Sequence, residues 1–582
     1  MSKKTSHANN KHNTQPLLVL LLSATGFGWA ASTAAQSTPE QQAIDQQRRA
    51  EQRQAGQAAQ LQPSPSVNLQ PPTANTPALL PTHEAPCFDI QRIELEGPSS
   101  AAFTWLLEHA DGHTQLPQPD PATGRCLGAQ GVQRVIDRLQ NALIGKGYVT
   151  SRILAQPQNL GTGVLKLKLM PGQVHDIVYS TGTGQRASRW NTVPTGPGQV
   201  LNLRDIEQAL ENYKRVPTTE ADIQITPASE PGSSDLVIVH QQPWPYRLSA
   251  TADDSGTRST GKYQGSLTLS YDNWWTLSDL FYLTLSHDLG GADPGPRGTQ
   301  GHTLHYSVPY GYWLLALNSS NNNYNQTVAG ASQNYLYSGT SDSADIKLSR
   351  IVHRSSTGKT SLSLKGFQRR SNNYIDDTEV QVQRRVVAGL EWGLNHKTSL
   401  SQGSLDANLN YKVGTGAWGS LPAPEEAFGE GTSRMRLLQA DINLQQPFEL
   451  AGRKYNYSGQ WRWQGNRTAL TPQDRFAIGG RYTVRGFDGL SVLSAERGWL
   501  LRNEVSTALT QQVQGYIAAD IGHVDGPSAA QLAGQSLSGG VLGLRGQIGK
   551  VQWDVFAGGP LHKTQHFNTS STTAGFSLAV QF

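Results

Sequence analysis

The chain has 582 residues, enough for several domains, and 37% of them are hydrophobic. Its 48 Lys and Arg residues are almost balanced by 44 Asp and Glu residues, which leaves a formal net charge of +4. Because acids and bases are interspersed, the sequence lacks the basic footprint of a nucleic-acid-binding protein, and nucleic acid is not an expected partner.

Residues 1–35 have the layout of a secretory signal peptide. Three lysines precede the apolar run PLLVLLLSATGFGWA, and the small residues STAA follow it. The short apolar run and the small residues favour a cleaved signal over the alternative, a retained membrane anchor.

Export places the rest of the chain in an oxidising compartment, where disulfides persist. The sequence contains two cysteines, Cys87 and Cys126, and we expect them to pair. No metal or other cofactor is expected, because two thiols provide too few ligands and no further CxxC or HExxH pattern adds others.

The next segment, residues 36–60, predicts a helix that is polar on every side. Thr38 can cap it, Pro39 suits its first position, and Gln41 completes a capping box. Ala43 and Ile44 are nearly its only apolar residues, so it cannot anchor itself in a hydrophobic core. Two interpretations remain open: a disordered tail, or a helix in a water-filled cavity. The proline-rich residues 61–86 predict an extended, semi-rigid linker.

Residues 87–173 and 174–245 predict two similar α/β units in tandem. In the first, strand-like residues 90–97 lead to a helix over residues 131–148, and residues 164–172 alternate Leu with Lys in the period of a half-buried strand. The second repeats this order, with a helix over residues 202–217.

Residues 246–582 consist of short alternating segments separated by Gly, Asn, Asp and Ser. LDANLNYKV and YNYSGQWRWQ each show one apolar or aromatic face and one polar face. A soluble sheet with one wet face is one interpretation. A transmembrane barrel is favoured, because Tyr and Trp are enriched on the apolar face and the chain ends in Phe582. At roughly 21 residues per strand and connection, about sixteen strands fit.

The whole mature arrangement closely resembles the outer-membrane transporters of two-partner secretion, the TpsB or ShlB/FhaC/HecB type. The most specific matches are the helix NLRDIEQALENYKRVP, the stretch KGYVTSRILAQPQNLGTGVLKLKLMPG, and VRGF, which is Val484, Arg485, Gly486 and Phe487. The resemblance implies an α+β region of two periplasmic POTRA domains followed by a transmembrane antiparallel β-barrel of about 16 strands.

The resemblance also implies a contact between a loop and the barrel wall. In this family the VRGF segment is the tip of a loop, here about residues 465–498, that folds into the lumen and places its arginine against an acid on a late strand. The nearest match to the acidic motif is Ala518-Ala519-Asp520, in which Ala518 departs from the usual Phe or Gly. Alternation independently places Asp520 on the lumen side, where a charge-assisted contact with Arg485 would form. The alternative is a solvated arginine in an external loop.

The function implied by the resemblance is recognition and secretion, with or without activation, of a large exoprotein such as a haemolysin or an adhesin. The transporter would act without ATP, as a monomer in outer-membrane lipid, with its POTRA domains in the periplasm and the polar helix in the pore. The candidate surfaces for the cargo are helix residues 203–213 with their neighbouring strand in the second unit, and the corresponding elements of the first unit.

Three other classes of protein fit the sequence less well. A BamA-type assembly factor shares the barrel and VRGF but usually carries more POTRA units, and a passive porin needs no periplasmic domains. An enzyme is not expected, since GxxxxGK[ST] is absent and the 15 histidines form no recognisable catalytic spacing.

Overall fold

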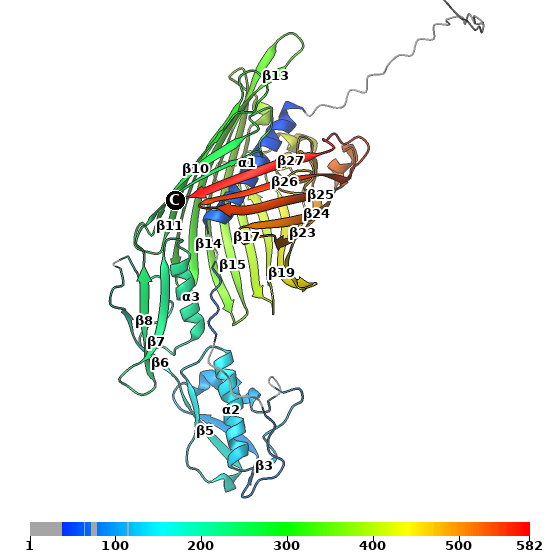
Figure 1. Ribbon diagram of the computed structural model, residues 1–582. Coiled ribbons are helices and arrows are strands. Elements are labelled where there is room, and N and C mark those ends of the chain that lie inside the picture. The colour runs from blue at the N-terminus through cyan, green and yellow to red at the C-terminus, as the bar shows by residue number, and fades with distance from the viewer. Residues whose placement is uncertain (1–37, 63–64, 71–77, 113–115, 185) are drawn as a thin grey trace, which may run out of the picture. The chain divides into compact units, whose positions relative to one another are not determined.

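The computed structural model describes residues 38–62, 65–70, 78–112, 116–184 and 186–582 (Figure 1). The predicted signal peptide and part of the predicted linker lie outside these ranges. The described chain forms one long helix, two small α/β units and a closed β-barrel. Within the described ranges, no helix is long and apolar enough to cross a membrane.

Helix α1 (Pro39–Leu61) begins at the predicted capping box, which the structure confirms. The hydroxyl of Thr38 accepts a hydrogen bond from the Gln41 backbone N–H, and the Gln41 side chain accepts one from the Thr38 N–H, both at 3.3 Å. These bonds satisfy two backbone donors that a helix start leaves without partners. The helix therefore starts at a position that its own sequence specifies.

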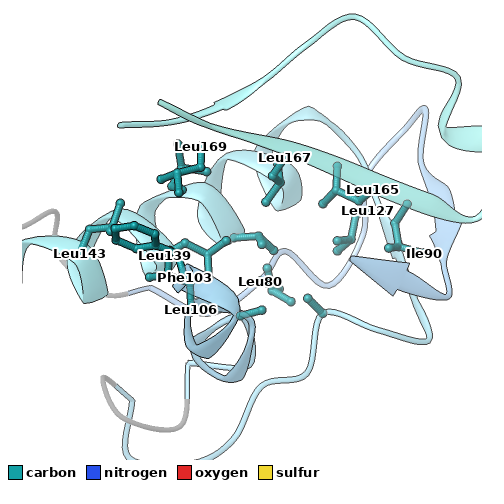
Figure 2. Packing of buried hydrophobic residues seen from close by; sticks show 14 residues of the cluster. Leu80, Ile90, Phe103, Leu106, Leu127, Leu139, Leu143, Leu165, Leu167 and Leu169 are labelled. Carbon is teal, nitrogen blue, oxygen red and sulfur yellow. The ribbon is translucent and has the colours of Figure 1, made fainter. Parts of the chain in front are cut away.

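The first α/β unit, called unit 1, has a three-stranded sheet in the order β2-β5-β4 and a two-stranded sheet of β1 and β3. Its elements are β1 (Phe88–Ile90), β2 (Arg92–Glu96), η1 (Ser100–His109), β3 (Arg125–Leu127), α2 (Ala129–Gly145), β4 (Arg152–Ala155), η2 (Leu160–Thr162) and β5 (Val164–Met170). Alternate leucines of β5, Leu165, Leu167 and Leu169, are fully buried against α2 and η1 (Figure 2). The predicted half-buried strand is confirmed.

The edge of β4 is partly closed by a side chain. Gln140 on α2 donates to the Ser151 carbonyl at 2.9 Å and accepts from the Ile153 N–H at 3.1 Å. A disulfide joins Cys87 and Cys126 beside the β1–β3 pair.

The second unit, called unit 2, repeats the topology of unit 1. It contains β6 (Gln173–Tyr179), α3 (Leu203–Lys214), β7 (Glu220–Pro227) and β8 (Ser233–Gln241). In each unit the last strand is central: it pairs parallel with the first strand and antiparallel with the strand after the helix. The predicted tandem repeat is therefore confirmed.

Sixteen antiparallel strands close into a barrel, as predicted, with β27 pairing back onto β9. They are β9 (Tyr246–Asp253), β10 (Gln264–Asp272), β11 (Leu280–Asp288), β12 (Gly298–Tyr310), β13 (Trp313–Ala329), β14 (Asn334–Arg354), β15 (Gly358–Ile375), β17 (Arg385–Ser399), β18 (Ser404–Thr415), β19 (Arg436–Leu450), β20 (Arg453–Asn466), β23 (Arg497–Ala508), β24 (Val513–Asp525), β25 (Ser536–Ile548), β26 (Val551–His562) and β27 (Thr573–Gln581). The two-residue β16 (Thr378–Glu379) extends β15.

The two ends of the barrel differ. Short turns such as 311–312 and 451–452 occupy the end where β9 follows β8, which we call the POTRA end. Longer connections occupy the opposite end, which we call the loop end, and they contain η3 (Gln381–Gln383), η4 (Pro424–Phe428), η5 (Pro472–Asp474), β21 (Phe476–Ile478), β22 (Leu493–Ala495) and η6 (Pro527–Gln531). Large apolar side chains stand exposed on the outer face, as a lipid-facing wall requires: Leu267, Leu285, Ile517 and Leu542.

Candidate functional site in the barrel lumen

The connection between β20 and β23 folds into the barrel and packs against its wall. Its two short strands, β21 and β22, pair with each other. Val484 is fully buried, and Phe487 meets Phe567 edge to face with 5.7 Å between ring centroids. These side chains belong to one hydrophobic cluster with Val524 of β24 and Leu537 of β25. The cluster holds the VRGF segment, which we call the VRGF loop, at a fixed place on the wall.

Within this loop the structure brings Arg485 and Asp520 together. The guanidinium is bidentate: Nε donates to one carboxylate oxygen at 2.7 Å and Nη2 to the other at 2.9 Å. The backbone N–H of Arg485 also donates to Asp520 at 2.9 Å. Asp520 is only 2% exposed, so this is a charge-assisted contact largely removed from water.

Glu504 is a second acid at this site, and the sequence reasoning missed it. It accepts from Nη1 of Arg485 at 2.6 Å and from Arg545 at 2.7 Å. Glu504 lies on β23, which pairs with β24, and Arg502 on the same strand lies 3.7 Å from Asp520. The alternation of RGWLLRNEVSTA places Arg502 and Glu504 on one face, so a lumen position for both was available from the pattern.

Glycines allow the loop to approach the wall this closely. Gly486 has a φ of +91°, and a Cβ there would lie 2.4 Å from the carbonyl oxygen of Gly559. A Cβ on Gly539 would lie 2.0 Å from the carbonyl oxygen of Arg485. Glycine is required at both positions because a Cβ would collide with a carbonyl oxygen. At Gly486 the positive φ is a second reason, since L-residues avoid it.

Helix α1 lies inside the ring of strands (Figure 1) and contacts the lumen wall through two ion pairs, Glu40 with Arg385 at 3.6 Å and Glu51 with Arg369 at 3.7 Å, and through side-chain amides. Gln46 donates to Thr257 at 2.7 Å, Gln57 to Ser266 at 3.0 Å, and Gln62 to the Tyr282 hydroxyl at 2.7 Å. These partners lie on or next to β9, β10 and β11. The polar composition of α1 thus matches a polar wall.

Two arginines of α1 contact the β20–β23 connection. Arg48 donates to the Pro472 carbonyl at 3.2 Å, and Arg49 donates to the Gly489 carbonyl. A cavity of about 310 Å³ separates the helix from the VRGF loop, with Asp45, Arg481 and Phe556 in its lining. The helix and the loop therefore share a boundary that is only partly filled.

Unit 2 is joined to the POTRA end of the barrel by a charged junction on α3. Arg354, at the end of β14, donates to Glu207 at 3.1 Å and to Glu211 at 3.0 and 2.9 Å, and Lys359 donates to Glu211 at 2.8 Å. Burial raises the pKa of Glu211, but the contacts with Arg354 and Lys359 outweigh it and hold that pKa below its ordinary value. The linker also contacts this junction, because the Val67 N–H donates to Glu211 at 2.9 Å.

This junction corrects the expectation that helix 203–213 offers a surface to the cargo. Its apolar side forms the core of unit 2. On its polar side, Gln208 and Asn212 donate to the Gly311 carbonyl of a barrel turn, at 3.3 and 2.8 Å. Both faces are occupied because α3 carries polar residues spaced to meet the barrel, a partner that helical periodicity alone does not identify.

Across the described ranges, no group of three His, Cys, Asp or Glu side chains is placed to hold a metal ion. The described lumen residues form charge pairs and amide hydrogen bonds around a partly filled pore.

The sequence matches known families along most of its length. Residues 232–546 match the family described as haemolysin secretion/activation protein ShlB/FhaC/HecB. Residues 88–172 match the POTRA domain of ShlB type, and residues 173–227 match a further POTRA family.

Among curated relatives, the chain is 35% identical to the outer membrane transporter CdiB-2 of Burkholderia pseudomallei over 94% of this chain and 96% of that protein. It is 26% identical to the hemolysin transporter protein HpmB of Proteus mirabilis over 89% of each. Among solved structures, CdiB from Acinetobacter baumannii superposes with a TM-score of 0.79 at 31% identity, over 94% of this chain and 99% of that one.

Proposed function

Because the chain belongs to the ShlB/FhaC/HecB family of two-partner secretion and is an outer-membrane transporter, we propose that it exports one large partner protein through its own lumen. The POTRA end then faces the periplasm and the loop end faces the exterior. The observation that carries the proposal is a polar lumen occupied by a polar helix, which is held by single hydrogen bonds and by two long ion pairs, Glu40 with Arg385 at 3.6 Å and Glu51 with Arg369 at 3.7 Å. Such an occupant can leave when another chain enters, because water replaces its contacts.

In this proposal α1 is a plug. It fills the lumen at rest, and the incoming cargo displaces it together with its contacts to Thr257, Ser266 and Tyr282. Deletion of residues 38–60 should raise ion conductance in planar bilayers without loss of membrane insertion. Unchanged conductance would show that α1 does not block the pore.

The cargo first meets the POTRA units, and β7 is the strand that fits this role. Among the described residues β7 pairs only with β8, so its other edge has free backbone groups. An extended segment of the cargo adds to that edge through main-chain hydrogen bonds. Ala228 and Ser233 form a hydrogen-bonded pair, so the register points the Ile225 N–H away from β8 and toward the free edge. Ile225→Pro should therefore reduce cargo binding, because proline removes that donor. The matched change Ile225→Ala keeps the donor and should not.

The decisive experiment is co-expression with candidate partners, beginning with a large exported protein encoded next to this chain. A transporter releases that one protein into the medium, whereas loss of an assembly factor of BamA type depletes many barrels. The family match already favours the transporter. Characterised family members are transporters and not enzymes, and we infer that this chain likewise acts without catalysis and as a monomer.

A further inference from the structure

Two arginines stand directly opposite each other at the loop end of β19 and β20. The register of the two strands pairs Leu437 with Asn466, and one step further the Arg467 N–H donates to the Arg436 carbonyl at 2.8 Å. Residues directly opposite in an antiparallel pair project to the same face. Like charges in that position destabilise a sheet unless something compensates them.

The face that they share is the outer one. Leu437, the neighbour of Arg436, is 1% exposed and packs with Met435 and Leu470 on the inner side. Further along β20, Arg462 reaches Asp441 in the lumen at 3.0 Å. Since neighbouring positions alternate, Arg436 and Arg467 point away from the lumen, and both are exposed.

A third arginine completes the group. Arg434 lies two residues before Arg436, is exposed, and extends its guanidinium over Gly416, where a Cβ would lie 3.2 Å from Nη2. In the part of the chain that the structure describes, no carboxylate forms an ion pair with any of the three. Of the three acids in the adjacent loop, Glu425 pairs with Arg385, Glu426 accepts from the Ser433 N–H at 3.0 Å, and the exposed Glu430 forms no ion pair with the group in the described chain.

The position of this arginine group along the strand matches a lipid headgroup. Trp463 and Trp499 face each other across β20 and β23 on the outer face, as expected for an aromatic belt at a membrane interface. Arg467 follows Trp463 by four residues, roughly 13 Å further along the strand toward the exterior. Apolar positions such as Leu438 and Ile442 continue below it toward the POTRA end.

We propose that Arg434, Arg436 and Arg467 form a binding site for the phosphates of a phosphorylated glycolipid of lipid A type in the outer leaflet. Guanidinium groups bind phosphate oxygens bidentately, and a bound phosphate removes the repulsion between Arg436 and Arg467. The aromatic belt then contacts the upper acyl chains. The site requires only the outer-membrane placement of the barrel and does not depend on how cargo passes through it.

The test is lipid retention by the full-length protein in detergent, measured by native mass spectrometry after incubation with lipid A. The R436Q/R467Q variant should retain at least tenfold less lipid A than the unaltered protein. The R350Q/R453Q variant is the matched control: it removes two exposed arginines from the POTRA end of the same wall and should change retention less than twofold.

Dephosphorylated lipid A separates phosphate recognition from acyl-chain contact, and phosphatidylglycerol separates the glycolipid from other anionic lipids. Both should be retained at least tenfold less than lipid A. The site is disproved if R436Q/R467Q retains lipid A normally, or if either of these two lipids binds equally well. Heat-modifiable migration of each variant in gel electrophoresis verifies that its barrel is folded.

Discussion

The VRGF loop and helix α1 both lie in the barrel lumen, yet they are held there by different chemistry. The loop is fixed by a buried guanidinium between two carboxylates, Asp520 and Glu504, and by a hydrophobic cluster. The helix is held by single hydrogen bonds from glutamines and by two longer ion pairs, whose glutamates Glu40 and Glu51 are 43% and 47% exposed. A buried charge without its partner is costly, whereas an amide that leaves one partner finds another in water. The contacts of the loop therefore resist displacement, whereas those of the helix can be replaced by water.

The largest expected effect follows from Arg485→Ala, which removes the bidentate partner of the buried Asp520 and one of the two arginines that bond Glu504. We expect a loss of about 3–5 kcal/mol of barrel stability and an almost complete loss of secretion. Thermal unfolding in detergent and release of the partner protein measure the two effects. Arg462→Ala is the control, because Arg462 also pairs with a lumen acid, Asp441, but both are partly exposed. Its cost should stay below about 1 kcal/mol. Equal losses in the two variants would contradict the special role of Arg485.

A smaller effect is expected from Gly486→Ala, which tests the close approach of the loop rather than its charge. The new Cβ would meet the Gly559 carbonyl oxygen, so the loop must shift, at about 1–3 kcal/mol. Gly489→Ala is matched, since Gly489 also has a positive φ, of +74°, but has no atom within 3.6 Å of its Cβ position. Gly486→Ala should unfold at a lower temperature than Gly489→Ala. The reverse order would mean that backbone strain, and not the contact with the carbonyl oxygen, determines the stability of this site.

The charged junction of unit 2 extends the comparison to a site outside the lumen, and it should depend on pH. The pKa of Glu211 is depressed in the assembled protein, so the stabilisation is present above its ordinary value of 4.5 and is lost as pH falls below that value. Spin labels on Glu230→Cys and Lys454→Cys report the distance between unit 2 and the barrel. In the unaltered junction the distance distribution should stay narrow from pH 6 down to 4.5 and broaden as pH falls further through the depressed pKa, whereas in Glu211→Gln it should be broad at every pH. A pH-independent distribution would argue against the junction.

The smallest effect is expected from Gln46→Ala on α1. Loss of its bond to Thr257 should cost about 1 kcal/mol of helix retention, and therefore raise the frequency of open-channel events only modestly. Gln47→Ala, which removes a bond to Glu51 within the helix, should leave conductance unchanged. If Gln46→Ala opened the pore as fully as deletion of the helix, the helix would depend on one contact and the comparison would fail.

Alternation and capping rules predicted the local parts of this structure well. The start of α1, the repeated α/β units and the barrel all follow from short-range patterns, because each element buries a face that its own sequence specifies. The pairing of Arg485 with Asp520 came from resemblance, since 35 residues separate them and no periodicity links them. Glu504 was visible only as a residue of the lumen face.

The junction between α3 and the barrel could not be predicted from the sequence. Glu207 and Glu211 are spaced like any solvated pair on a helix, and their partner Arg354 lies over 140 residues away. A polar helix face bound to another domain has the same pattern as one bound to water, so the cargo surface was expected on α3.

The side chain of Gln140 matters before the barrel has folded. While the chain is still in the periplasm, its exposed sheet edges are free to join those of neighbouring copies, a route to aggregation. By bonding the backbone of Ser151 and Ile153 itself, Gln140 leaves less of β4 available for such pairing. Gln140 thereby helps to keep the chain soluble until it reaches the membrane.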